Sequence, residues 1–206
     1  MAVLEVFADV SCPFAHAGLR RFVDERRARG LSEPVLAVRA WPLELVNGKP
    51  MTGDSLVEKI ASLREQVAPG RFAGFDPSTF PTTTLPALAG EAAARRHSDG
   101  TGEWFSLAIR EALFEHGADV GDPQVIDALL AEAGAGPVLP ADSDAVLASH
   151  REGLARNVKG SPHFFVGTEG YFCPSLDISH DEEGYDISFD LKGFATFVEA
   201  ALAPAA

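Results

Sequence analysis

A cysteine stands at the point where the first helix is expected to begin. Cys12 follows a strand-like apolar run at residues 3–7 and precedes Pro13, a residue favoured in the first helical turn. A cysteine there faces unpaired N–H groups and the positive end of the helix dipole, which both favour the thiolate. We therefore expect a lowered pKa for Cys12 and nucleophilic thiol chemistry. A Cys-x-x-Cys pair would have its second cysteine three residues on, where this chain has Ala15.

The other cysteine of the chain, Cys173, could complete this chemistry from far along the sequence. It lies on a segment predicted to be the second strand of a β-hairpin, opposite Phe164 if Val166 pairs near Tyr171. Two roles stay open for it, a buried core residue and a resolving cysteine. The sequence does not decide whether the two cysteine Cα atoms come within the roughly 4.4–6.8 Å that a disulfide needs.

The predicted first helix also carries His16 and a basic cluster. His16 lies one turn after Cys12, where a protonated imidazole could stabilise the thiolate and a neutral one could move a proton. The alternative for His16 is a residue that only fills surface. Arg20, Arg21 and Arg26 could bind the carboxylate of an anionic thiol or form a solvated helix face.

The elements that must position these residues follow a simple order. Residues 3–7 and 35–41 are predicted strands, and the helix at 13–29 between them completes a βαβ unit with a parallel strand pair. Helical spacing then predicts a block of helices without strands, at 54–67, about 85–97, 103–116, 123–133 and, from a cap at Asp142 or Ser143, to about 158. A hairpin at about 163–173, an acidic loop at 177–184, a short edge strand at 187–189 and a helix at 192–203 follow.

Composition narrows the partners and the compartment. Thirty acidic and 17 basic residues give a net charge of −13, so we expect no nucleic-acid partner and no anionic membrane partner. The strand-like N-terminus leaves no place for a signal peptide, and no apolar run is long enough to span a membrane. Two cysteines 161 positions apart make no secreted disulfide framework. A cytoplasmic location is therefore expected.

Four segments in this order resemble a known family. Residues 9–18, with Cys12, resemble its active-site stretch, and residues 41–45 resemble the turn after its second strand. Residues 81–87 resemble the start of its long inserted helix, and residues 160–164 resemble its cis-proline loop. The family is that of the DsbA-like thiol–disulfide oxidoreductases of the thioredoxin superfamily. The likeness is greatest to the cytoplasmic bacterial branch related to kappa-class glutathione transferases and 2-hydroxychromene-2-carboxylate isomerases.

The resemblance implies an α/β protein, a thioredoxin-like fold with a helical insertion domain. The thioredoxin-like part would comprise residues 1–49 and 149–206, and the inserted helical subdomain residues 50–148. It further implies that Pro162 is a cis-proline facing Cys12, and that the main chain of Ser161 binds an extended thiol substrate. Candidate substrate-binding residues are Pro13, Phe14, Trp41, Ser161, Pro162 and, as a lesser candidate, His163. No compact zinc pattern is present, so no metal site is expected.

Three functional hypotheses follow. In the first, the chain is a monothiol oxidoreductase: Cys12 forms a mixed disulfide, which an external small thiol or Cys173 resolves. In the second, it is a kappa-class-like transferase or isomerase that uses a low-molecular-weight thiol. In the third, it is a non-catalytic binding or redox-sensing protein whose Cys12 is modified by oxidants. No tightly bound cofactor is expected; glutathione or mycothiol is the candidate co-substrate, protein thiols are further candidate substrates, and a homodimer is left open.

Overall fold

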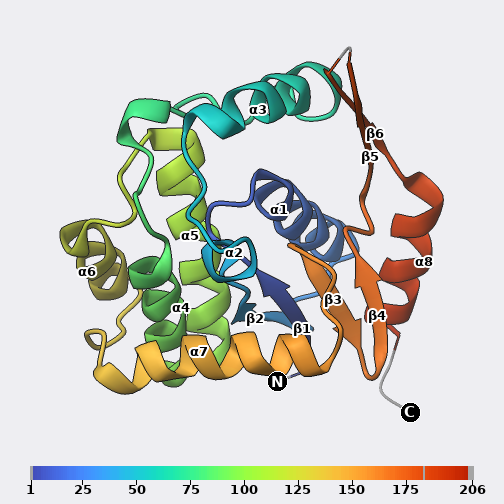
Figure 1. The fold of residues 1–206 in the computed structure, drawn as a ribbon. Helices are drawn as coiled ribbons and strands as arrows, with labels where there is room; N and C mark the ends of the chain where they lie inside the picture. Colours follow the sequence, from blue (N-terminus) through green and yellow to red (C-terminus); the bar gives the residue numbers. More distant parts are fainter. Residues whose placement is uncertain (1, 183, 204–206) are drawn as a thin grey trace.

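A four-stranded sheet forms the centre of the computed structural model, which describes residues 2–182 and 184–203. β1 (Val3–Ala8) and β2 (Val35–Ala40) run parallel, joined by α1 (Pro13–Ala28), so the predicted βαβ unit is confirmed. β3 (His163–Val166) pairs antiparallel with β1, and β4 (Glu169–Phe172) pairs antiparallel with β3. The strand order is therefore β2-β1-β3-β4 (Figure 1).

Alternate residues of the strands face opposite sides of this sheet. Val6 and Phe164 lie opposite each other in the ladder and pack in one buried cluster with α1 and α8 (Leu191–Ala201). Phe7 and Phe165 face the other way and pack with Trp41 in a second cluster. α7 (Pro140–Ala155) covers that second face, with its Gly153 so close to Trp41 that a Cβ would lie 2.5 Å from the indole ring.

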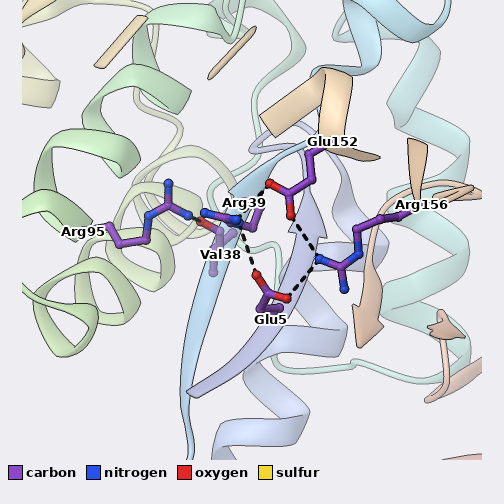
Figure 2. Close-up of polar contacts among 6 residues, drawn as sticks. All are labelled: Glu5, Val38, Arg39, Arg95, Glu152 and Arg156. Atoms are coloured by element: carbon purple, nitrogen blue, oxygen red, sulfur yellow. Dashed lines mark hydrogen bonds and ion pairs between the residues drawn. The ribbon is translucent and has the colours of Figure 1, made fainter. Parts of the chain in front are cut away.

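A ring of charged side chains fastens α7 to the sheet (Figure 2). Glu152 of α7 accepts from Arg39 of β2 at 2.9 Å, and Arg156 donates to Glu5 of β1 at 3.0 Å and to Glu152 at 3.2 Å. Arg39 and Glu5 complete the ring at 3.4 Å, and the Arg156 guanidinium lies over the Phe165 ring, 3.9 Å from its centroid. Ion pairs and an apolar cluster therefore hold the same helix.

The helical block follows β2 and precedes β3. Its elements are α2 (Leu43–Val46), α3 (Asp54–Gln66), the 3-10 turn η1 (Pro77–Thr79), α4 (Leu85–His97), α5 (Asp99–His116), α6 (Pro123–Glu132) and α7. α5 begins four residues earlier than predicted, because the Ser98 side chain caps it by accepting from the Thr101 N–H at 3.0 Å. The predicted domain boundary between residues 148 and 149 falls inside α7 and stays a prediction.

The predicted cap of α7 is wrong. The helix begins at Pro140 and ends at Ala155, and Asp142 occupies its third position instead of preceding it. From there the Asp142 carboxylate accepts from the Leu139 N–H at 2.8 Å and pairs with Arg96 of α4 at 3.0 Å. A carboxylate in the first turn satisfies the same free N–H groups that a cap would.

The sequence predicts a loop for the acidic segment after the hairpin, but the structure has a ribbon of two antiparallel strands there. β5 (Leu176–Asp181) and β6 (Gly184–Phe189) pair in register, with Ile178 opposite Ile187. Gln66 at the end of α3 holds the ribbon: its Nε2 donates to the Tyr185 carbonyl at 2.9 Å, and its Oε1 accepts from the Ile187 N–H at 2.6 Å. Figure 1 shows α3 and the ribbon meeting above α1. Tertiary contacts therefore order a segment whose composition predicted a loop.

The hairpin register differs from the predicted one and moves Cys173. Val166 pairs with Glu169 across a two-residue turn, so Phe164 faces Tyr171 and not Cys173. Cys173 follows the last pair of the ladder and donates its N–H to the Pro162 carbonyl at 3.0 Å. The shift brings Cys173 to the loop that contains Pro162.

Candidate active site

Cys12 lies against the proline loop at the start of α1. It is the N-cap residue of this helix, with φ −82° and ψ 112°, and buried Pro13 is the first helical residue. Its Sγ donates to the Ser161 carbonyl at 3.0 Å, and the peptide bond between Ser161 and Pro162 is cis. The structure therefore brings together Cys12, Ser161 and Pro162, as the family resemblance implied.

Burial reverses the expected direction of the Cys12 pKa. The residue is only 4% exposed, and loss of water around the sulfur raises the pKa of the thiol above its ordinary 9.0. The free N–H groups of Phe14 and Ala15 act in the opposite, expected direction, but burial outweighs them. The expectation of a lowered pKa is therefore wrong for this closed arrangement, in which Cys12 is a neutral thiol at pH 7.

Asp9 is a functional candidate that the sequence analysis missed. It is fully buried at the end of β1, and its carboxylate accepts from the Ser11 N–H at 2.7 Å and the Leu43 N–H at 2.6 Å. Its own N–H donates to the Ser161 Oγ at 2.9 Å. Burial raises the pKa of Asp9, and its negative charge contributes to the raised pKa of Cys12. An acidic residue directly after a buried strand and three positions before the cysteine was the available signal.

Cys173 approaches the same loop from the other side. Its Sγ forms no disulfide, its side chain is 6% exposed, and its backbone has a positive φ of 45°. Burial, followed by the nearby Cys12, raises the pKa of Cys173 to about 12. Cys12 hydrogen-bonds the carbonyl of Ser161, and Cys173 hydrogen-bonds that of Pro162, so one dipeptide contacts both cysteines.

His16 is buried between α1 and α5, not at the surface. Its Nε2 lies 2.7 Å from Glu115 Oε1, and its ring packs on those of Phe72 and Phe114 at 5.2 Å between centroids. Burial lowers the pKa of His16, so the neutral ring donates to the carboxylate at pH 7. Burial alone would raise the pKa of Glu115, but hydrogen bonds from His16 and the Phe72 and Ala73 N–H groups lower it to about 2. Because the His16 ring is neutral, it does not supply the positive charge that would stabilise a Cys12 thiolate. Proton transfer by His16 stays a prediction.

The remaining candidate substrate-binding residues are Phe14, Trp41 and His163, and their contacts differ. Phe14 is half-buried and packs against the cluster that contains Cys12 and against a third buried cluster, which the helical block forms around Leu88 and Phe105. Trp41 is 2% exposed and packs on Phe7 under α7, the contacts of a core residue. His163 accepts from the Lys159 N–H at 3.0 Å and stacks on Phe165, on the sheet face opposite Phe164. Substrate binding by these three residues stays a prediction.

A helix that begins at a cysteine, a facing cis-proline loop and a central parallel strand pair define a thioredoxin-like site. The sequence matches the model of the DSBA-like thioredoxin domain over residues 3–181, and the chain belongs to that family. A search of curated proteins found no match. None of the helices in the described part of the chain is long and apolar enough to cross a membrane.

Solved structures share the fold at low sequence identity. A proposed protein disulfide isomerase from Nitrosomonas europaea has 19% identity and a TM-score of 0.61, over 82% of this chain and 87% of that one. 2-Hydroxychromene-2-carboxylate isomerase has 13% identity and a TM-score of 0.61, over 82% and 88%. The cytosolic disulfide reductase DsbM from Pseudomonas aeruginosa has 15% identity and a TM-score of 0.60, over 97% and 98%, and a structure of it with GSH is also similar.

Proposed function

We propose that this chain is a monothiol thiol–disulfide oxidoreductase with Cys12 as its nucleophile. The observation that supports this most is the contact of Cys12 Sγ with the Ser161 carbonyl beside the cis Pro162. A disulfide substrate in extended form would replace that contact and pair with the main chain of Ser161. Membership of the DSBA-like family and the likeness to a cytosolic disulfide reductase also favour this chemistry and a cytoplasmic location.

The reaction proceeds by two exchanges. The Cys12 thiol first loses its proton, and the thiolate attacks one sulfur of the substrate disulfide, which forms a mixed disulfide and releases the other sulfur as a thiolate. The mixed disulfide is then resolved by a second thiolate. An external thiolate, such as that of glutathione or mycothiol, would attack the substrate sulfur of the mixed disulfide, which releases Cys12 as a thiolate and forms a disulfide between the external thiol and the substrate. Cys173 would instead form a Cys12–Cys173 disulfide and release the substrate thiol, with two electrons passed to the substrate.

Mass spectrometry of the intact protein after treatment with oxidised glutathione tests the proposal. We expect a glutathione adduct on wild type that disappears in Cys12→Ser. If Cys173 resolves the adduct, wild type loses it to an internal disulfide, while Cys173→Ser keeps it. If wild type and Cys173→Ser both keep the adduct, resolution is assigned to an external thiol. A protein that forms no adduct at any pH up to the denaturing limit would contradict the proposal.

The raised pKa of Cys12 gives the test a pH signature. Because only the thiolate attacks a disulfide, the adduct rate should still be rising at pH 9, where an unperturbed cysteine is already half ionised. A rate that levels off below pH 8 would show that substrate reaches an already ionised Cys12. That result would contradict the closed, neutral form as the reacting state.

The neutral thiol also supports a second candidate function. A protonated Cys12 can donate a hydrogen bond to the sulfur of a bound small thiolate and orient it toward an electrophile, as a thiol-dependent transferase or isomerase requires. Serine can make the same bond. Cys12→Ser that retains glutathione-dependent turnover of an electrophile would support this candidate, and loss of turnover would contradict it. Binding of a thiol without either reaction would favour a redox-sensing protein.

A further inference from the structure

A small pocket opens beside α1 on the side of the two cysteines. Its volume is about 210 Å³, and α1 contributes Ala17, Arg21 and Asp24, which share one face of the helix. The opposite walls come from the segment after α3, with Arg71, and from the segment that follows Cys173, with Ser175. Whole drug-sized ligands occupy sites of about 300–1,000 Å³, so this pocket would accept only part of a ligand.

Arg21 brings a positive charge without a carboxylate partner into this pocket. No acidic side chain of residues 2–182 or 184–203 forms an ion pair with it. Its guanidinium lies 3.8 Å from the ring centroid of Phe189 and 4.5 Å from that of Phe194, and its Nη1 is 3.4 Å from the Ser175 carbonyl. The two rings fix the position of the charge and leave the donors on its other edge available.

Three neighbouring arginines, one in the pocket and two on α1, are neutralised by carboxylates. Arg71 pairs with Asp24 at 3.1 Å across the pocket. Arg20 pairs with Glu111, and Arg26 pairs with Glu103 at 2.7 Å. Of the three arginines that the sequence offered for an anionic thiol, the structure therefore leaves only Arg21 unpaired. Because the chain has a net charge of −13, few unpaired positive charges are available to bind an anion.

The pocket lies next to the proline loop. Gly18 follows Ala17 on α1, and a Cβ built on it would lie 3.4 Å from Cγ of Pro162 and 3.5 Å from Oγ of Ser175. Ser175 is itself two residues after Cys173. Arg21 is nine residues after Cys12, about 13.5 Å along the helix axis, and long helical side chains extend back toward the N-terminus. Oxidised glutathione, two tripeptides joined at sulfur, is long enough in extended form to cover this span.

We propose that this pocket binds the carboxylate of an anionic small thiol or disulfide while its sulfur reacts with Cys12, and that Arg21 is the specificity-determining residue. The inference rests on the proposed thiol exchange at Cys12 and adds a preference for negative charge. Arg21 binds the carboxylate by a charge-assisted hydrogen bond, and the carboxylate of Asp24 weakens that binding.

Three disulfides of different charge test the inference. The rate of mixed-disulfide formation at Cys12 is measured with oxidised glutathione (anionic), hydroxyethyl disulfide (neutral) and cystamine (cationic). We expect wild type to react with oxidised glutathione faster than with cystamine, and this preference to shrink as salt screens the charge. Arg21→Met should lower the ratio of the glutathione rate to the hydroxyethyl rate about tenfold, the loss of one hydrogen bond to a charged group.

Two further variants of α1 complete the design. Arg27→Met removes an exposed arginine of the same helix outside the pocket, and the rate ratio should stay at the wild-type value. Asp24→Asn removes an exposed carboxylate from the pocket and releases Arg71 from its ion pair, so the ratio should rise, and this surface change tests the role of the pocket even if Arg21→Met does not fold.

The outcomes separate this inference from the proposed function. No reaction of Cys12 with any of the three disulfides would overturn the thiol exchange itself. Reaction with all three, at a rate ratio that neither Arg21→Met nor Asp24→Asn changes, would overturn the role of the pocket and leave the exchange intact. An equal loss of the rate ratio in Arg21→Met and Arg27→Met would show that any positive charge on α1 has this effect. That result would also overturn the role of the pocket.

Discussion

Polar groups have different surroundings at the start of α1 and on the α7 side of the sheet. At the start of α1, Asp9 and Cys12 are buried, and their partners are mainly N–H groups, hydroxyls and a carbonyl. On the side of α7, Glu5, Arg39 and Glu152 form ion pairs with side chains that remain 28–38% exposed. Burial shifts the pKa of both groups of the first set toward the neutral form. The comparison suggests that the first region adjusts reactivity and the second region holds a helix.

The largest loss of stability should come from truncating the buried aromatic side chains on the two faces of the sheet. Phe164→Ala removes a ring that is 1% exposed and packs on Phe22 and Phe197, and should cost about 3–5 kcal/mol of unfolding free energy. Phe165→Ala on the α7 side should cost less, because that ring is 7% exposed. Urea denaturation measures both, and Phe172→Ala, with a ring that is half exposed, is the control. A greater loss for Phe165→Ala would reverse the ranking.

Acid should weaken the contact of α1 with α5 in two steps. The pKa of His16 is lowered in the fold, so the unfolded chain binds more protons and stability falls as pH drops through 6.5. Glu115 has a pKa of about 2 against 4.5, so its contribution is complete above pH 4.5 and is lost between 4.5 and 2. The raised pKa of Asp9 acts in the opposite direction, so the lower step is measured as the difference in unfolding free energy between wild type and Glu115→Gln from pH 8 to 3. This difference should be about 1–3 kcal/mol at pH 7 and should shrink below pH 4.5. A difference that stays constant down to pH 3 would contradict the lowered pKa of Glu115.

Asp9→Asn separates charge from hydrogen bonding at the start of α1. The amide cannot accept on both of its polar atoms, so the N–H of Ser11 or Leu43 loses a partner, at a cost of about 1–2 kcal/mol. The pKa of Cys12 should fall because a nearby negative charge is gone. The pH dependence of Cys12 alkylation by iodoacetamide measures this, with Asp144→Asn, at an exposed carboxylate of α7, as the control. An unchanged profile would show that Asp9 acts only as a hydrogen-bond acceptor.

The smallest loss of stability should come from breaking the ring of ion pairs that holds α7 against the sheet. Glu152→Gln removes one carboxylate that Arg39 and Arg156 share, and exposed pairs of this kind contribute about 0.2–1 kcal/mol. High salt should reduce the difference between wild type and variant in thermal unfolding. A loss above 2 kcal/mol that persists in high salt would mean that the α7 side depends on its charges as strongly as the start of α1 does on burial.

The sequence alone determined the βαβ start, the helical block and the hairpin, which follow from local signals: apolar periodicity, caps and turn residues. The contact of Cys12 with the proline loop was implied only by the resemblance of four short segments to the DsbA-like family. The local signals also predicted α4 (Leu85–His97) with its bounds as observed, because periodicity and flanking residues agree there.

Only the tertiary structure decided the ionisation of the site and the surroundings of Arg21. A helix N-terminus predicts a lowered pKa for Cys12, but the sulfur's loss of water depends on residues about 150 positions away, which local sequence does not contain. The hairpin register decided that Cys173 reaches Pro162. The ion pairs of Arg20 and Arg26 with α5, and the rings around Arg21, decided which arginine keeps an available charge, because pairing is a property of the packed helices.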